Sequence, residues 1–230
     1  DLERKTEEIR TVIESGLLPA GLEASIEKYY RTLGDEVRVA VRSSATAEDL
    51  PEASFAGQHD TYLDIQTVAR IADATKRCWA SMWTARATSY RKTQNIDHFD
   101  VGVAVVIQQM VDSDVAGVVF TANPLTTATD ETVINASWGL GEAIVASLVT
   151  PDSFIIKHDT LRVREKTLGT KQVKTVRNPE TGIGTLEIEV AKADQERFCL
   201  TDRQVAELAE LCTRVMDYYG GFPQDLEFGI

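Results

Sequence analysis

Two acidic residues near the end of the sequence could together hold a metal ion. Asp225 and Glu227 are separated by a single residue. If this segment is a strand, residues i and i+2 point to the same face, so both carboxylates lie on one side. Two such carboxylates repel each other unless a cation lies between them, and Mg²⁺ is the usual hard cation of phosphate chemistry. The pair predicts a magnesium site, although a solvated edge strand would show the same spacing.

Arg42 could bind phosphate. It follows a predicted strand in which Val37, Val39 and Val41 alternate, and the small residues 43–46 come next. Small side chains let backbone N–H groups approach a phosphate, and arginine offers a rigid fork of donors. Taken alone, an arginine at a strand end is more often part of a surface ion pair.

Three further positions could contact a nucleotide. Gly57 permits close approach of the backbone, and Thr61 supplies a hydroxyl. Gln108 ends an apolar run and could reach the ribose or the adenine edge, with Met110 and Val111 as apolar walls. Each position by itself is also consistent with an ordinary turn or strand end.

Other sites of chemistry are weaker or missing. Glu142 follows a glycine-broken turn at residues 138–141, where it could approach a nucleotide or cap the next helix. The sequence contains neither GxxxxGK[ST] nor GxGxxG, so Walker and Rossmann sites are absent in their usual forms. No pair of its histidines has metal-ligand spacing: His59, His98 and His158.

These residues need a scaffold of helices and strands. Periodicity predicts an opening helix over 3–13, one long helix over 67–90 and a central strand over 101–108. Further strands are predicted over 116–121 and 132–136, a hairpin around 158–160, and a helix after the capping box at 201–204. Hairpins, long strands and flanking helices together predict an α+β fold with mixed sheets.

Composition limits the class of protein. The 230 residues are 43% apolar, enough to bury a core as one large domain or two small lobes. A net charge of −12 without a visible basic patch argues against nucleic-acid binding. No apolar run reaches the length of a membrane span, and three widely spaced cysteines indicate buried thiols. We therefore expect a soluble cytoplasmic protein that binds no nucleic acid and no membrane.

Read together, the windows around these residues resemble one family. Residues 41–51 (VRSSATAEDLP), continued by 53–58 (ASFAGQ), resemble the signature of the PEP/pyruvate-binding, ATP-grasp-like domain. That domain occurs in phosphoenolpyruvate synthase, pyruvate phosphate dikinase and rifampin phosphotransferase. Four later segments follow in the family's order: 108–111, 117–124, 135–142 and 225–228. The resemblance covers essentially the whole chain.

The resemblance implies an ATP-grasp-like architecture with two lobes, residues 1–108 and 109–230. It implies that Arg42 contacts the phosphates of ATP and that Gly57 and Thr61 lie at the nucleotide. It places Gln108 at a hinge beside adenine or ribose, and makes Glu142 a weaker nucleotide-binding candidate.

For the metal and the reaction, the resemblance implies that Glu227, with Asp225, binds Mg²⁺. ATP would phosphorylate a histidine on a swivelling domain of the same polypeptide, with release of AMP and phosphate. The phosphohistidine would then phosphorylate pyruvate or another small molecule bound by another domain. A rifampin phosphotransferase, or a module that binds ATP without turnover, are the alternatives.

Several parts of the family pattern are missing from this sequence. These are an N-terminal lysine region, a Gln-x-Arg strand expected after Glu227, and the phosphohistidine and acceptor domains. We therefore expect a fragment of a longer enzyme that is not a complete catalyst on its own.

Overall fold

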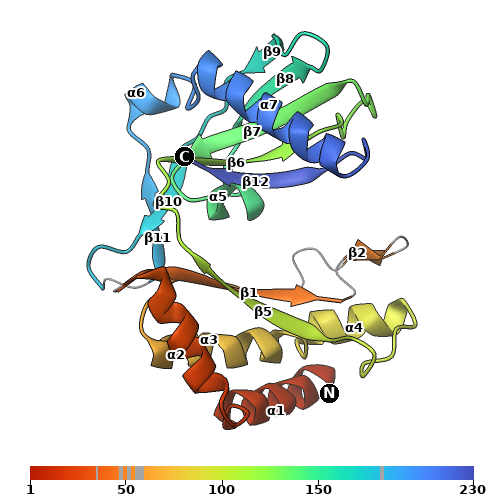
Figure 1. Cartoon of the computed structure of the whole chain (residues 1–230), viewed down its shortest axis with the longest axis vertical. Helices are drawn as coiled ribbons and strands as arrows, with labels where there is room; N and C mark the ends of the chain where they lie inside the picture. Colours follow the sequence, from red (N-terminus) through yellow and green to blue (C-terminus); the bar gives the residue numbers. More distant parts are fainter. Residues whose placement is uncertain (35, 47–48, 51–52, 55–59, 182–183) are drawn as a thin grey trace. The chain divides into compact units, whose positions relative to one another are not determined.

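The computed structural model describes residues 1–34, 36–46, 49–50, 53–54, 60–181 and 184–230 (Figure 1). Helices alternate with antiparallel sheets, which confirms the predicted α+β fold. Every strand pairing among the described residues is antiparallel, so the predicted mixed sheets are wrong. Only some of these pairs join consecutive strands, for which a short turn requires antiparallel pairing; the others join strands distant in the sequence.

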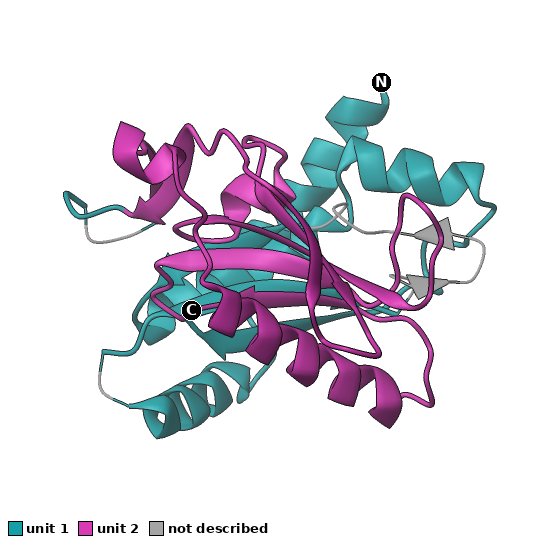
Figure 2. Cartoon of the chain, turned by 90° about the horizontal axis from the view of Figure 1, so that it is seen from above, with its two compact units in different colours: residues 1–110, 178–184 teal, residues 111–177, 185–230 magenta. Residues whose placement is uncertain are grey.

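The chain divides into two compact units (Figure 2). Unit 1 contains Asp1–Met110 and Asn178–Gly184, and unit 2 contains Val111–Arg177 and Thr185–Ile230. The assignment of residues 1–108 and 109–230 as ATP-grasp-like lobes stays a prediction.

Unit 1 packs helices against one face of a three-stranded sheet (Figure 1). The sheet has the order β4-β1-β5, and a separate pair is formed by β2 (Asp49–Leu50) and β3 (Ala53–Ser54). The strands of the three-stranded sheet are β1 (Val39–Ala45), β4 (Thr61–Ile65) and β5 (Val103–Gln109). The helices of unit 1 are α1 (Leu2–Ser15), α2 (Leu22–Leu33), α3 (Val68–Ser81) and α4 (Ala85–Thr93).

The core of unit 1 lies between β1 and α3. Val39 and Val41 of β1 are fully buried and pack in one cluster with Ile71 and Cys78 of α3. Because successive strand residues alternate between faces, the residues between these valines point to the opposite face of the sheet.

The strand predicted over residues 101–108 is confirmed as β5, but its predicted central position is wrong, because β1 is the central strand of this sheet. That run forms β5, which lies at one end of the strand order and alternates between half-buried and exposed residues. Its outward residues Ala104 and Val106 are apolar yet exposed. An unbroken apolar run therefore did not reflect burial on both faces.

The helix predicted over 67–90 is interrupted. α3 ends at Ser81 and α4 begins at Ala85, with Thr84 between them as the N-cap. The Thr84 hydroxyl accepts a hydrogen bond from the Ala87 backbone N–H at 3.1 Å. Threonine competes for backbone hydrogen bonds in this way, which explains why an uninterrupted apolar pattern contains a second helix start.

Unit 2 is a five-stranded antiparallel sheet in the order β12-β6-β7-β8-β9, covered on one face by α7 (Figure 1). A two-stranded sheet of β10 and β11 is separate. The elements are β6 (Val115–Phe120), β7 (Glu131–Trp138), α5 (Glu142–Val145), β8 (Asp152–Lys157), β9 (Val163–Thr167), β10 (Val173–Arg177), β11 (Thr185–Glu189), α6 (Lys192–Gln195), α7 (Asp202–Tyr218) and β12 (Asp225–Gly229).

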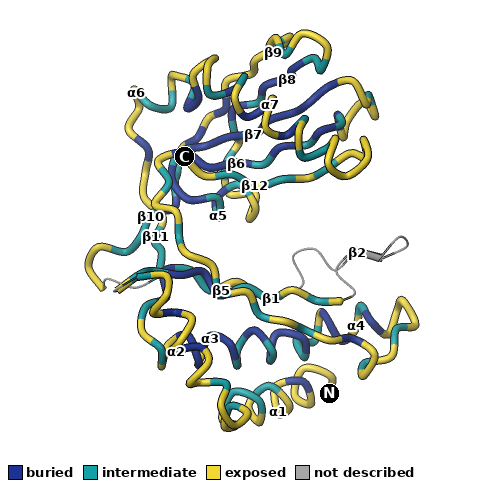
Figure 3. Tube along the Cα trace, in the orientation of Figure 1, coloured by how far each residue is buried: buried dark blue, intermediate teal, exposed yellow. Residues whose placement is uncertain are grey.

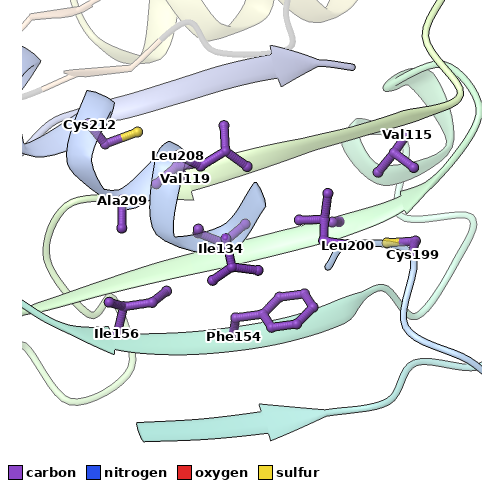
Figure 4. Packing of buried hydrophobic residues seen from close by; sticks show 12 residues of the cluster. Val115, Val119, Ile134, Phe154, Ile156, Cys199, Leu200, Leu208, Ala209 and Cys212 are labelled. Atoms are coloured by element: carbon purple, nitrogen blue, oxygen red, sulfur yellow. The ribbon is translucent and has the colours of Figure 1, made fainter. Parts of the chain in front are cut away.

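The main core of unit 2 joins α7 to the sheet (Figure 4). Val119, Ile134 and Phe154 from three adjacent strands are fully buried in one cluster with Val205 and Ala209 of α7. The predicted capping box is confirmed, because Thr201 and Gln204 exchange both hydrogen bonds at the start of α7. Figure 3 shows that burial is deepest along these central strands and declines towards β12.

Candidate functional site

Three of the predicted nucleotide-binding residues share one face of the unit 1 sheet. Arg42 is the direct cross-strand partner of Thr61 on β4 and of Val106 on β5. Gln108 pairs with Ala40, two residues before Arg42 on the same strand. Cross-strand partners point to the same side, and so do residues i and i+2. The register therefore brings Arg42, Thr61 and Gln108 together on the face opposite the helices.

This face is partly open. Gln108 and Thr61 are exposed, Arg42 is half-buried, and Val106 keeps 46% of its surface accessible. Ala40, with its small side chain, lies between the glutamine and the arginine in the register. This face thus combines the guanidinium of Arg42, the hydroxyl of Thr61 and the amide of Gln108 with the apolar side chains of Ala40 and Val106. Such a surface suits a ligand with an aromatic ring and a charged phosphate group.

Asp60 anchors the chain at the start of β4. Its backbone carbonyl accepts hydrogen bonds from the Ser43 hydroxyl at 3.3 Å and from the Cys78 thiol at 3.7 Å. Its carboxylate accepts a hydrogen bond from the Tyr62 hydroxyl at 3.1 Å. Burial, followed by the charge of Asp60, raises the pKa of Tyr62, so this phenol stays protonated. Sequence reasoning missed this anchor, which fixes the residue before Thr61.

Gly57, the remaining predicted nucleotide contact in this half of the chain, lies outside the described residues. The same holds for His59.

In unit 2, the acid pair lies on a strand as predicted, and this strand, β12, is at the edge of its sheet. Asp225 and Glu227 are exposed on β12, while Leu226 and Phe228 pack against the core under α7. The two carboxylates therefore share the face opposite α7. Burial, followed by the charge of Glu227, raises the pKa of Asp225. The contribution of Glu227 to this shift has the sign expected for two like charges on one face of a strand.

A close approach of backbone and ring holds β12 against β6. Gly117 is the partner of Phe228, and a Cβ on this glycine would lie 2.6 Å from the Phe228 ring and 2.2 Å from the Asn135 carbonyl oxygen. Only glycine leaves room for the ring at this position. Packing of Phe228 on the core side therefore directs Glu227 to the other side.

Glu142 is the first residue of α5, and this short helix begins on the face that carries the acid pair. A Cβ on the preceding residue, Gly141, would lie 3.7 Å from the Cβ of Ala116. Ala116 pairs with Gly229 of β12, which is two residues from Glu227 on the same side of that strand. The fold thus starts α5 on the Glu227 side of the sheet.

A buried polar network organises the turn after β6. Asn123 accepts hydrogen bonds from the backbone N–H groups of Leu125 and Thr126 at 3.0 and 3.3 Å. Its amide donates to the buried carboxylate of Glu131 at 2.9 Å. This hydrogen bond, with those from Lys157 and Arg164, lowers the pKa of Glu131. Sequence reasoning missed this network.

The acid pair fits a magnesium ion that also contacts a ligand. Among the residues that the structure describes, no group of three or more histidine, cysteine, aspartate or glutamate side chains is placed to hold a metal by itself. Mg²⁺ is commonly bound through one or two carboxylates, with waters and substrate phosphates completing its octahedron. Asp225 and Glu227 match that incomplete protein shell.

Membrane insertion through a helix finds no support in the described ranges, where every helix is too short or too polar to span a bilayer.

Each unit carries groups of kinds that bind phosphates or their cations. One unit carries an arginine, a hydroxyl and an amide on one sheet face, and the other carries paired carboxylates. Comparison with known families defines the class of protein. Over residues 1–230 the sequence matches the family described as pyruvate phosphate dikinase, AMP/ATP-binding domain, and the chain belongs to this family.

Curated relatives agree with the family. The chain is 49% identical to a phosphoenolpyruvate synthase of Pyrococcus furiosus, over 99% of its own length and 29% of the relative's. It is 42% identical to the phosphoenolpyruvate synthase of Aquifex aeolicus, over 99% and 28%. It is 41% identical to a rifampicin phosphotransferase of Bacillus cereus, over 97% and 25%. The chain thus spans about a quarter to a third of the length of these relatives.

Proposed function

We propose that this chain is the ATP-binding domain of a phosphoenolpyruvate-synthase-like dikinase. The enzyme would transfer a phosphoryl group from ATP to a histidine on a separate swivelling domain, with release of AMP and phosphate, and the resulting phosphohistidine would pass the group to pyruvate. Membership in the dikinase nucleotide-binding family and 49% identity to a phosphoenolpyruvate synthase support this proposal. The fold proposed for the two units is ATP-grasp-like, and the cytoplasm, which supplies ATP, is the proposed compartment.

The register of the unit 1 sheet is the observation that supports the proposal most. It aligns Arg42, Thr61 and Gln108 on one face, with Val106 as the neighbour of the arginine. Arg42 would hold the phosphates through its bidentate fork and neutralise charge that develops during transfer. Thr61 would donate its hydroxyl to the same tail, and Gln108 would contact ribose or adenine. Gly57 is proposed to let the backbone approach the nucleotide.

In unit 2, Asp225 and Glu227 would hold Mg²⁺, and Glu142 is proposed as an additional nucleotide contact. The ion, when bound, supplies charge neutralisation at the phosphates. The chain's own contribution is to present both carboxylates on one face, which the core packing of Leu226 and Phe228 enforces. Such positioning and electrostatic stabilisation account for most of the catalysis in phosphoryl transfer.

A second candidate is the ATP-binding domain of a rifampin phosphotransferase. The 41% identity to the Bacillus cereus rifampicin phosphotransferase favours it. The nucleotide half-reaction is the same in both candidates, and the acceptor domain decides between them. A module that binds nucleotide without turnover is the third candidate.

The acceptor is identified by incubating the full-length protein with MgATP and either pyruvate or rifampicin. Formation of AMP and phosphate with pyruvate, accompanied by phosphoenolpyruvate, is the expected result. AMP formation only with rifampicin would favour the second candidate. Binding of ATP without AMP in either reaction would leave the non-catalytic module.

A further inference from the structure

The strand that carries the acid pair is held at its two ends in different ways. β12 lies at the edge of its sheet, next to β6. At the far end, the backbone of Ile230 exchanges hydrogen bonds with the backbone of Val115 at 2.8 and 3.2 Å. At the end that carries the acid pair, a side chain adds to the backbone hydrogen bonds. Thr121, which directly follows β6, is hydrogen-bonded through its hydroxyl to the backbone of Gln224, which directly precedes Asp225.

Thr121 makes three hydrogen bonds to the backbone of Gln224. The Thr121 N–H donates to the Gln224 carbonyl oxygen at 2.9 Å. The Gln224 N–H donates to the Thr121 hydroxyl oxygen at 2.6 Å, and that hydroxyl donates to the Gln224 carbonyl at 3.3 Å. Thr121 is fully buried, so water does not readily replace the hydroxyl once it is removed.

The position of Thr121 is in turn set by the polar network two residues later. Asn123 is buried and its amide is bound to Glu131, whose carboxylate is held by Lys157 at 3.1 Å and by Arg164. A backbone hydrogen bond from Asn123 N–H to the Ala128 carbonyl at 2.8 Å closes the turn. These hydrogen bonds fix Asn123, two residues after Thr121, against Glu131 at the start of β7.

We propose that Thr121 is a positioning residue for the cation site, because its hydroxyl fixes where β12 begins and so holds Asp225 and Glu227 at one register. The inference rests on the proposed function of the acid pair. Two like charges on an edge strand favour fraying of that strand, and the hydroxyl opposes it at the charged end. In this proposal Thr121 acts through the position of β12 and not by contact with the cation or the nucleotide.

The test compares Thr121→Val with Thr121→Ser in the full-length protein. Valine keeps the branched shape and removes the hydroxyl, whereas serine keeps the hydroxyl. We expect Thr121→Val to raise the Mg²⁺ concentration for half-maximal AMP formation about tenfold, as supporting residues of metal sites commonly do. Thr121→Ser should restore the wild-type value. Mn²⁺ binding to the ATP complex, followed by electron paramagnetic resonance, should change in parallel.

Thr132→Val is the matched control. Thr132 is also buried, lies on β7 of the same sheet, and its hydroxyl is hydrogen-bonded to His158 Nε2 at 3.0 Å. Its loss should lower stability while leaving the Mg²⁺ dependence unchanged. If Thr121→Val does not fold, Asn123→Ser, which frees the same segment from Glu131, should shift the Mg²⁺ dependence in the same direction.

Two results would overturn the inference. The first is a wild-type Mg²⁺ dependence in Thr121→Val, or in Asn123→Ser if the valine variant does not fold. The second is a shift in Thr132→Val as large as that in Thr121→Val. Glu227→Gln separates this failure from failure of the proposed function. If Glu227→Gln shifts the Mg²⁺ dependence and Thr121→Val does not, only the positioning role is wrong. If neither variant shifts it, the acid pair is not the cation site.

Discussion

Glu227→Gln should have opposite effects on stability with and without its cation. Asp225 and Glu227 lie two residues apart on one face of β12, which places the carboxylates about 7 Å apart. Two unit charges at that distance repel by roughly 0.6 kcal/mol in water. Solvent screening of this exposed pair keeps the effect within that size. Without divalent cations, the glutamine variant should therefore be slightly more stable than the wild type.

The pH dependence follows from the raised pKa of Asp225. A carboxyl whose folded-state pKa is raised contributes stability that is present below its unfolded pKa and is lost as pH rises through the folded pKa. At a pH above the folded-state pKa of Asp225 its carboxylate is charged, and its repulsion by Glu227 acts in full. Removing the charge of Glu227 should therefore stabilise the cation-free fold at neutral pH and have little effect in acid, where Asp225 is protonated.

MgATP should reverse the order of stability of the glutamine variant and the wild type. At a ligand concentration of about 100 times Kd, binding stabilises a protein by roughly 2.7 kcal/mol. If the glutamine variant binds tenfold more weakly, the same concentration stabilises it by only about 1.4 kcal/mol. The variant should thus change from slightly more stable to clearly less stable than the wild type.

Urea denaturation of the full-length protein at neutral pH, with EDTA or with MgATP, measures both effects. Glu165→Gln is the control, because Glu165 is an exposed glutamate on β9, at the opposite end of the same sheet. An equal MgATP gain in Glu227→Gln and the wild type would refute the metal-ligand assignment. A less stable variant in EDTA would refute the repulsion argument.

Two further variants test the scaffold of unit 2. Lys171→Met removes a fully buried amine that donates to Asp152 at 2.5 Å, so it should destabilise by about 3–5 kcal/mol in urea denaturation. The double variant with Asp152→Leu should recover little of that loss, because the Asp152 carboxylate also accepts hydrogen bonds from the buried N–H groups of Gly169 and Cys199. A single-variant loss below about 1 kcal/mol would contradict the buried-pair argument. Gly117→Ala places a Cβ 2.6 Å from the Phe228 ring, so it should cost about 1–3 kcal/mol and weaken MgATP binding. Gly141→Ala, with its nearest contact at 3.7 Å, is the control for stability, and an equal loss in both would contradict the packing argument.

Strand alternation was the most informative part of the sequence for the candidate site. Alternating valines at 37, 39 and 41 predicted β1, and the i, i+2 spacing of Asp225 and Glu227 predicted carboxylates on one face. Both predictions depend only on the two-residue period of a strand, which a local sequence segment contains in full. Whether Arg42 and the acids contact ATP and Mg²⁺ stays a prediction.

The remaining features depend on partners distant in sequence. The register that aligns Arg42 with Thr61 and Val106 joins segments 19 and 64 residues apart, and no local pattern specifies it. The apolar run of β5 wrongly indicated a strand buried on both faces. A run of apolar residues shows which side chains a strand carries, but not whether another element covers each face of it. The hydrogen bonds of Thr121 to Gln224 span 103 residues, which is why the support of β12 was not recognised.

The central claim is that Arg42 binds the phosphates of ATP, and titration calorimetry of Arg42→Lys with MgATP tests it most directly. Lysine keeps the charge but loses the bidentate fork, so binding to the full-length protein should weaken at least about tenfold, or roughly 1.4 kcal/mol. Arg31→Lys, an exposed arginine of α2 that pairs with Glu27, should bind MgATP as the wild type does. Wild-type affinity in Arg42→Lys would contradict the account and leave Arg42 without a role at the nucleotide.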